Sequence, residues 1–193
     1  MATTTACRRV VVVTPLVVAG VVMWLRRRRR AVLAAVDVGS MEHKLVVARG
    51  TEVLHSEAVS VPLALNMEDG RLSAEIVATS RRVLADFRRT AKAFKAEALA
   101  GVATAAFRRA ANGREALEDH KDVVTLIDQK AEGRLGYLTA IAAAKRSGIK
   151  DVISWDSGGG SFQLAIEDRV YEGPVGSGDA HALRDATDIV DQL

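Results

Sequence analysis

The sequence has little cysteine, few aromatic residues and no clustered histidines, and these shortages limit the kinds of cross-link, core and metal site that the protein can form. Its 193 residues include one cysteine, Cys7, which excludes an internal disulfide and a paired-cysteine metal site. Aromatic residues make up 4% of the chain, so a core has to be built from Ala, Val, Leu and Ile. The four histidines show no metal-ligand spacing, and we interpret them as surface or loop residues: His43, His55, His120 and His181.

Acidic residues are absent from residues 1–30, which contain seven arginines. The rest of the chain therefore has 20 of the 27 basic residues and all 24 acidic ones. A body with this balance lacks the basic surface that duplex nucleic acid requires, so we exclude nucleic acid as a partner.

An uncharged apolar stretch, Val10–Leu25, precedes a block of five arginines, Arg26–Arg30. The stretch is slightly shorter than the roughly 20 residues that a membrane-spanning helix needs, although snorkelling arginines compensate for a small shortfall. We expect residues 1–30 to be a membrane anchor through residues 10–25, with the following domain on the cytoplasmic side. Two alternatives stay open: a presequence for a mitochondrion or plastid, and an extension without function.

From residue 31 onward, the pattern changes to short strands and helices. Three apolar runs separated by short turns predict an antiparallel meander: AVLAAVDVGS, KLVVARG and EVLHSEAVSV. ALAGVATAAF and DVVTLI predict further strands, and DVISWDSGGGSFQLAI predicts a strand, a glycine turn and a second strand. Strands followed by alternating helices and strands indicate an α/β domain with a mixed sheet.

Two longer helices are predicted from N-cap residues and apolar spacing. Ser73 is expected to cap a helix with one apolar face, formed by Ile76, Val77, Val83, Leu84, Phe87 and Phe94. Asp128 is expected to cap a second helix that carries Leu135, Leu138 and Ile141 and stops at Gly148.

Two strands end in an aspartate and a glycine turn. The first turn has Asp37, Gly39 and Ser40, and the second has Asp156, Gly158, Gly159, Gly160 and Ser161. An aspartate at a strand end holds a hydrated Mg²⁺, and adjacent glycines let backbone N–H groups converge on an anion. Either turn alone most often merely reverses the chain. Together they predict a paired phosphate clamp, with Asp37 and Asp156 as metal ligands.

Four segments in order resemble the exopolyphosphatase and guanosine pentaphosphate phosphohydrolase (Ppx/GppA) family of the actin-like and Hsp70-like ATPase superfamily. They are AAVDVGSMEHKLVVARG, GVATAAFRRAANGREAL, LIDQKAEGRLGYLTA and ISWDSGGGSFQLAI, within roughly residues 31 to 178. The resemblance implies a ribonuclease H-like fold with a first lobe at residues 31–150. Residues 151–193 would then be the start of a second lobe, which is truncated. It also implies Mg²⁺-dependent hydrolysis of the terminal phosphoanhydride of polyphosphate or a guanosine polyphosphate.

The same resemblance assigns two catalytic residues. It implies that Arg108 contacts substrate phosphate and that Glu132 is the general base. A planar guanidinium suits phosphate oxygens. We expect the positive end of the helix dipole to favour the ionised carboxylate of Glu132, because the residue lies in the first turn of its helix.

Three positions depart from the family pattern: Met41 replaces an asparagine, while Ala131 and Gln163 replace acids. They support a second interpretation, a non-catalytic phosphate-binding remnant. Because a glutamine also follows a similar turn in the apyrases, an apyrase-like nucleotide phosphohydrolase is the enzymatic alternative. A purely structural fragment is the third interpretation. The sequence leaves open whether the chain forms a homo-oligomer.

Overall fold

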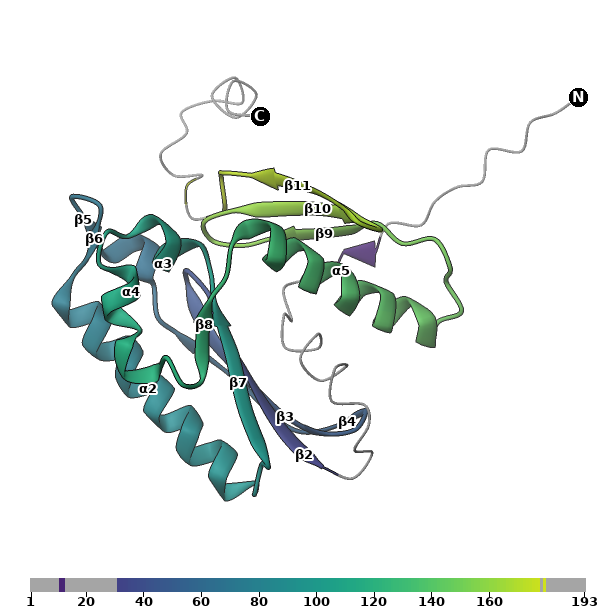
Figure 1. The fold of residues 1–193 in the computed structure, drawn as a ribbon, viewed down its shortest axis with the longest axis horizontal. Coiled ribbons are helices and arrows are strands. Elements are labelled where there is room, and N and C mark those ends of the chain that lie inside the picture. Colours follow the sequence, from purple (N-terminus) through teal and green to yellow (C-terminus); the bar gives the residue numbers. More distant parts are fainter. Residues whose placement is uncertain (1–10, 13–30, 178, 180–193) are drawn as a thin grey trace, which may run out of the picture.

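The computed structural model describes residues 11–12, 31–177 and 179 of the protein. Two β-sheets lie beside each other, each with helices against it (Figure 1). A short hairpin of β5 (Met67–Glu68) and β6 (Arg71–Leu72) lies outside both sheets. The predicted α/β architecture with a mixed sheet is confirmed.

The first sheet has the strand order β4-β3-β2-β7-β8. Its strands are β2 (Val32–Val38), β3 (Glu42–Arg49), β4 (Glu52–Ser60), β7 (Ala98–Ala103) and β8 (Val124–Leu126). β2, β3 and β4 form the predicted antiparallel meander, while β7 runs parallel to both β2 and β8. The glycine turn after β2 therefore lies at the same edge of the sheet as the end of β7, because parallel strands end on the same side.

Helix α2 (Ala74–Ala93) supplies much of the first core. The hydroxyl of Ser73 accepts a hydrogen bond of 3.4 Å from the N–H of Ile76, so the predicted cap is confirmed. Four of the predicted apolar positions are buried: Ile76, Val83, Leu84 and Phe87. Phe94 follows the last helical residue and is 37% exposed, so its predicted place on the buried face is wrong. Two short helices follow β7, namely α3 (Ala105–Arg109) and α4 (Gly113–Ala116).

The second sheet has the strand order β1-β9-β10-β11. Its strands are β1 (Val11–Val12), β9 (Ser154–Ser157), β10 (Phe162–Ile166) and β11 (Arg169–Gly173). Helix α5 (Gln129–Arg146) packs against β9, β10 and β11 (Figure 1). The sequence analysis placed this helix in the first lobe through residue 150, whereas the structure packs it on the second sheet.

The buried face of α5 consists mainly of small residues, which explains the difference. The side chains of this face belong to Glu132, Gly133, Gly136, Thr139, Ala140 and Ala144. A Cβ atom on Gly133 would lie 2.5 Å from Cγ1 of Val170, so the helix backbone approaches the sheet closely. Of the three larger apolar residues that the predicted helix carries, Leu138 is 38% exposed, while Leu135 and Ile141 are half-buried.

Two histidines are buried, contrary to the surface interpretation. His43 on β3 is 0% exposed and His120 is 7% exposed. Nε2 of His43 lies 2.9 Å from Oγ of Ser80, which links β3 to α2. Burial lowers the pKa of His43 to about 4 from 6.5. The folded protein therefore holds this imidazole neutral.

We expect His43 to make the fold sensitive to acid. The unfolded chain binds a proton at His43 more readily than the folded protein does, so this contribution to stability is complete above pH 6.5. It falls by about 3 kcal/mol as the pH drops toward 4. Urea unfolding between pH 4 and 7 should therefore show a smaller decrease for His43→Gln than for wild type. If the free energy of unfolding of His43→Gln falls as steeply with pH as that of wild type and of the His55→Gln control, the assignment is contradicted.

The predicted anchor at residues 10–25 lies outside the described residues except for Val11 and Val12. These two residues form β1, which pairs in parallel with Ser154 and Trp155 of β9. Within the part of the chain that the structure describes, no helix has the length and apolar character needed to span a membrane.

Candidate active site

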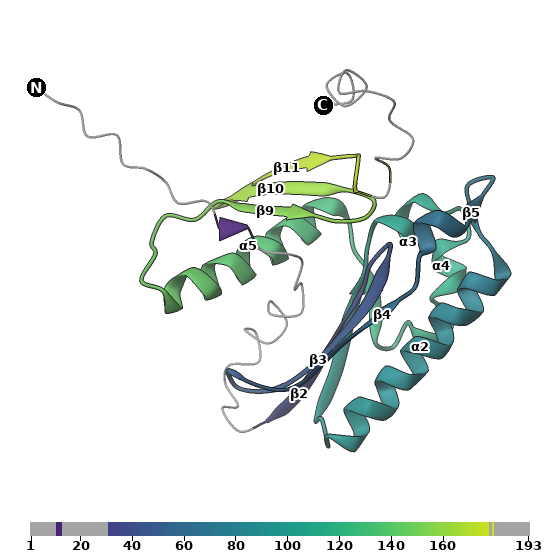
Figure 2. The same cartoon turned by 180° about the vertical axis from the view of Figure 1, so that it is seen from behind.

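The turns after β2 and β9 meet at a cleft of about 210 Å³. In both Figure 1 and Figure 2 the turn after β9 lies beside α3. The cleft lining contains most of the site residues predicted from sequence: Asp37, Gly39, Ser40, Glu132, Gly158, Gly159, Gly160 and Ser161. The other two predicted residues, Arg108 and Asp156, lie next to this lining. Arg108 bonds to Glu132 and Ser161, and Asp156 is buried at the end of β9 with an exposed fraction of 3%.

The two turns are in direct contact with each other. A Cβ atom on Gly159 would lie 2.6 Å from Cγ of Met41, and one on Gly160 would lie 3.1 Å from Oγ of Ser40. A side chain at Gly159 would therefore require Met41 to move, and one at Gly160 would be tightly packed.

The first turn is fixed by its own hydrogen bonds. The N–H of Gly39 donates to the carbonyl of Glu42 over 3.1 Å, and a Cβ atom on Gly39 would lie 2.9 Å from that oxygen. The hydroxyl of Ser40 accepts a 3.1 Å hydrogen bond from the N–H of Ala106. The turn is thus tied to α3, the helix that carries Arg108.

Two buried carboxyl groups lie at the strand ends. Burial raises the pKa of Asp37 from 3.8 to about 7, with Glu132 and Asp156 raising it further and Lys44 lowering it. Burial also raises the pKa of Asp156 to about 7. Neither carboxyl oxygen of Asp156 has a hydrogen-bond partner among the described residues. A buried carboxyl group without a partner is costly when ionised, so this end of the cleft favours a cation.

Glu132, which lines the cleft, forms an ion pair with Arg108. Nη1 of Arg108 donates to Oε2 of Glu132 over 2.7 Å and to the carbonyl of Ile127 over 3.1 Å. Nη2 of Arg108 donates to Oγ of Ser161 over 3.3 Å. One guanidinium therefore joins α3, the start of α5 and the glycine turn.

Burial acts against the ionised form of Glu132. Glu132 is 6% exposed, and burial raises its pKa above 4.5, while Arg108 acts in the opposite direction. The expectation that the helix dipole favours the ionised form thus omitted the effect of burial. A raised pKa suits a general base, because it brings proton affinity closer to the working pH.

Sequence reasoning missed Lys44, which lines the cleft. Its charge lowers the pKa of both Asp37 and Asp156, against the effect of burial. Lys44 lies directly opposite Asp37 in the β2–β3 register. The alternation of side chains along the strand following the first turn was the signal that could have found it.

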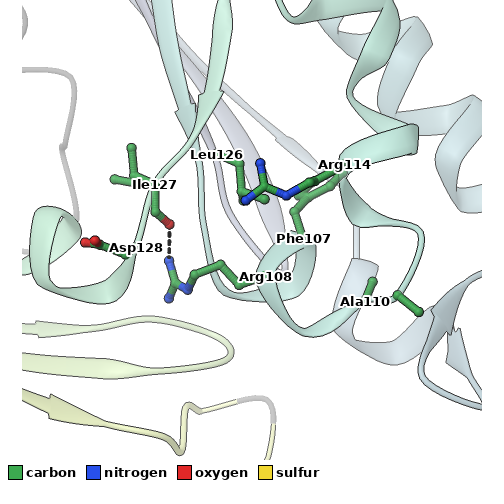
Figure 3. Close-up of a pocket in the computed structure, with 8 residues that line it drawn as sticks. Phe107, Arg108, Ala110, Arg114, Leu126, Ile127 and Asp128 are labelled. Carbon is green, nitrogen blue, oxygen red and sulfur yellow. Dashed lines mark hydrogen bonds between the residues drawn. The ribbon is translucent and has the colours of Figure 1, made fainter.

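A second cavity, of about 290 Å³, has Arg108 in its lining (Figure 3). Figure 3 shows Arg108 donating to the carbonyl of Ile127 and Arg114 reaching toward Leu126. Arg108 is the only predicted site residue in its lining, so the predicted site lies at the first cleft.

Comparison with known proteins identifies the family. The sequence profile of the Ppx/GppA phosphatase family matches residues 18–177, most of the chain. The chain belongs to this family. No curated protein matches the chain.

Solved structures of Ppx/GppA proteins share the fold. The Ppx/GppA family member from Aquifex aeolicus is 26% identical, with a TM-score of 0.65 over 83% of this chain and 58% of its own. An exopolyphosphatase from Cytophaga hutchinsonii is 17% identical, with a TM-score of 0.69 over 83% of this chain and 57% of its own. The chain thus spans little more than half the length of these structures, and it has the actin-like ATPase fold of the Ppx/GppA family.

The carboxyl groups of this Ppx/GppA chain suit a hard cation. Asp37 and Asp156 offer oxygen ligands, the type that Mg²⁺ prefers, and both oxygens of Asp156 lack other partners among residues 31–177 and 179. No group of three or more His, Cys, Asp or Glu side chains that could hold a metal occurs in the described part of the chain. Mg²⁺ usually takes one or two carboxylates and completes its coordination with water and substrate phosphate.

A Gly159→Ala substitution tests the contact between the two turns of this Ppx/GppA domain. The new Cβ atom would overlap Cγ of Met41, so we expect the free energy of unfolding to fall by about 1–3 kcal/mol. Met41→Ala removes Cγ, and the double variant should recover much of the loss in urea unfolding. Additive losses, measured against Met41→Ala alone, would contradict the contact.

Proposed function

We propose that the chain hydrolyses the terminal phosphoanhydride of polyphosphate or a guanosine polyphosphate, with Mg²⁺ as cofactor. The observation that carries the proposal is that two glycine turns and Glu132 line one cleft, with Arg108 bonded to Glu132 and Ser161 of that lining. Membership of the Ppx/GppA phosphatase family and similarity to a solved exopolyphosphatase support it.

Each cleft residue has a role in this proposal. N–H groups of the turns that do not donate within the turn itself, such as those of Gly159 and Ser161, bind phosphoryl oxygens, and the guanidinium of Arg108 stabilises the charge that develops on the transferred group. The carboxylate of Glu132 orients the attacking water and accepts its proton. Phosphoryl transfer needs mainly positioning and charge stabilisation, which this set of groups provides.

Asp156 and Asp37 would hold Mg²⁺ at the strand ends. When bound, the ion would supply charge neutralisation for the phosphate oxygens. The raised pKa values of both carboxyl groups mean that ionisation and cation binding are linked. We therefore expect cation affinity to increase as the pH rises through about 7.

A substrate panel tests the proposal with the full chain. Phosphate release is measured with long-chain polyphosphate, guanosine pentaphosphate, ATP and ADP, each with Mg²⁺ and with EDTA. The proposal expects Mg²⁺-dependent release from one of the first two substrates. Binding of polyphosphate without turnover would instead support a non-catalytic remnant.

An apyrase-like activity on ATP or ADP is the second candidate. Gln163 is 1% exposed, and its Nε2 donates to Oγ of Ser161 on the glycine turn over 3.0 Å. A glutamine thus supports the phosphate-binding turn where the Ppx/GppA pattern has an acid. A preference for ATP or ADP in the same panel would select this candidate.

A further inference from the structure

The glycine turn after β9 is held by residues that follow β11, one of which, Ser177, also lines the cleft. The N–H and the hydroxyl of Ser177 both donate to the carbonyl of Gly158, over 2.9 and 3.2 Å. Gly176 packs directly on the turn, because a Cβ atom there would lie 2.3 Å from the nitrogen of Gly160. The chain after the second sheet therefore returns to the turn.

Arg109 on α3 connects this returning segment to the first lobe. Both guanidinium Nη atoms donate to the carboxylate of Asp179, with separations of 3.0 to 3.1 Å. Nη1 also donates to the carbonyl of Gly160 over 3.4 Å. Asp179 in turn accepts a 2.8 Å hydrogen bond from the N–H of Gly176. We call Arg109, Ser177 and Asp179 the brace.

The brace bonds to two carbonyls of the turn, and this fixes the direction of two N–H groups. A trans peptide unit is planar, so its C=O and N–H point in opposite directions. The N–H of Gly159 therefore points away from Ser177, and the N–H of Ser161 points away from Arg109. Neither N–H donates to another residue within 31–177 and 179. Both residues line the cleft.

We propose that Arg109 and Asp179 are positioning residues which, with Ser177, turn the N–H groups of Gly159 and Ser161 toward a phosphoryl group in the cleft. The proposal rests on the proposed function, because it names the groups that orient the phosphate-binding turn. Three adjacent glycines have broad conformational freedom, so a turn of this sequence needs outside contacts to keep its donors preorganised.

A merely structural ion pair would behave differently. The side chains of Arg109 and Asp179 are 47% and 24% exposed, and ion pairs that are this open to water contribute little to stability. Arg88 and Asp122 form a comparable exposed pair between α2 and the segment before β8, and neither residue lines the cleft. Arg88→Ala is therefore the matched control.

The experiment uses the full chain and compares wild type, Arg109→Ala, Arg109→Lys, Asp179→Asn and Arg88→Ala. Calorimetric titration with inorganic phosphate measures anion affinity, and polyphosphate hydrolysis gives kcat and KM. We expect Arg109→Ala and Asp179→Asn to lower phosphate affinity and kcat/KM about tenfold to a hundredfold. Their melting temperatures should stay close to that of Arg88→Ala.

Two comparisons sharpen the result. Arg109→Lys keeps the charge and loses the bidentate fork, so it should fall between wild type and Arg109→Ala. The charge-exchanged double variant, Arg109→Asp with Asp179→Arg, should recover part of the affinity that either single change removes. Phosphate affinity and kcat/KM within about twofold of Arg88→Ala in both Arg109→Ala and Asp179→Asn would overturn the proposal.

The titration separates this proposal from the proposed function. Wild-type protein that binds phosphate but hydrolyses none of the substrates would overturn the proposed activity. In that case a lower phosphate affinity of Arg109→Ala would still support the brace. Unchanged affinity in that variant, together with normal hydrolysis by wild type, would overturn the brace alone.

Discussion

Glu132→Gln is expected to release phosphate from polyphosphate at least a hundredfold more slowly than wild type, with little change in substrate affinity. A positioned general base typically contributes about 10²- to 10⁴-fold to the rate. The amide of glutamine has nearly the same shape as the carboxylate, and its oxygen can accept the hydrogen bond from Nη1 of Arg108. What the variant loses is the ability to take a proton from water.

The matched control for this prediction is Glu75→Gln. Glu75 occupies the first turn of α2, as Glu132 occupies the first turn of α5, but Glu75 is exposed and lies away from the cleft. The control should keep wild-type kcat. A Glu132→Gln variant with kcat within about threefold of this control would remove Glu132 from the mechanism.

The pH profile gives an independent check on the same residue. Glu132 is active as a base only when ionised, and burial raises its pKa above 4.5. Activity should therefore rise with pH through a limb that lies above 4.5. Arg108 lowers the pKa of Glu132, so replacing Arg108 with glutamine should move this limb to higher pH while also lowering the maximum rate.

The sequence was informative wherever local chemistry determines the structure. Met41 occupies the space of a side chain at Gly159, and Ser40 leaves little room for one at Gly160; such crowding is visible as a glycine run after an apolar strand. The caps at Ser73 and Asp128 were equally predictable, because a short polar side chain bonds to an N–H three residues later.

The placement of α5 depended on contacts that a single sequence does not display. A buried face of Gly136, Ala140 and Ala144 has no strong apolar periodicity, so the sequence pattern does not reveal which face of the helix packs on a sheet. Close packing on the second sheet is what places Glu132 near Asp156, and that contact joins residues 24 positions apart. Likewise, nothing in the local sequence of Arg109 indicates a partner as distant as Asp179.

Asp156→Asn is expected to abolish the Mg²⁺ dependence of phosphate release and, in the absence of cation, to stabilise the fold at pH 8. Burial raises the pKa of Asp156 from 3.8 to about 7, so the folded protein binds this proton more tightly than the unfolded chain does. Its contribution to stability is then complete below pH 3.8 and is lost as the pH rises through about 7. Asparagine removes this loss.

The expected gain is roughly 2–4 kcal/mol at pH 8 in EDTA, with little difference from wild type near pH 4. Asp151→Asn, a change of an exposed aspartate five positions earlier, should show no such gain and is the control. Added Mg²⁺ should raise the melting temperature of wild type, because an ion that binds only the folded state stabilises it. It should have a much smaller effect on Asp156→Asn. If Asp156→Asn is no more stable than wild type at pH 8, the ionised carboxylate of Asp156 does not destabilise the fold. If this variant also responds fully to Mg²⁺, Asp156 does not hold the metal.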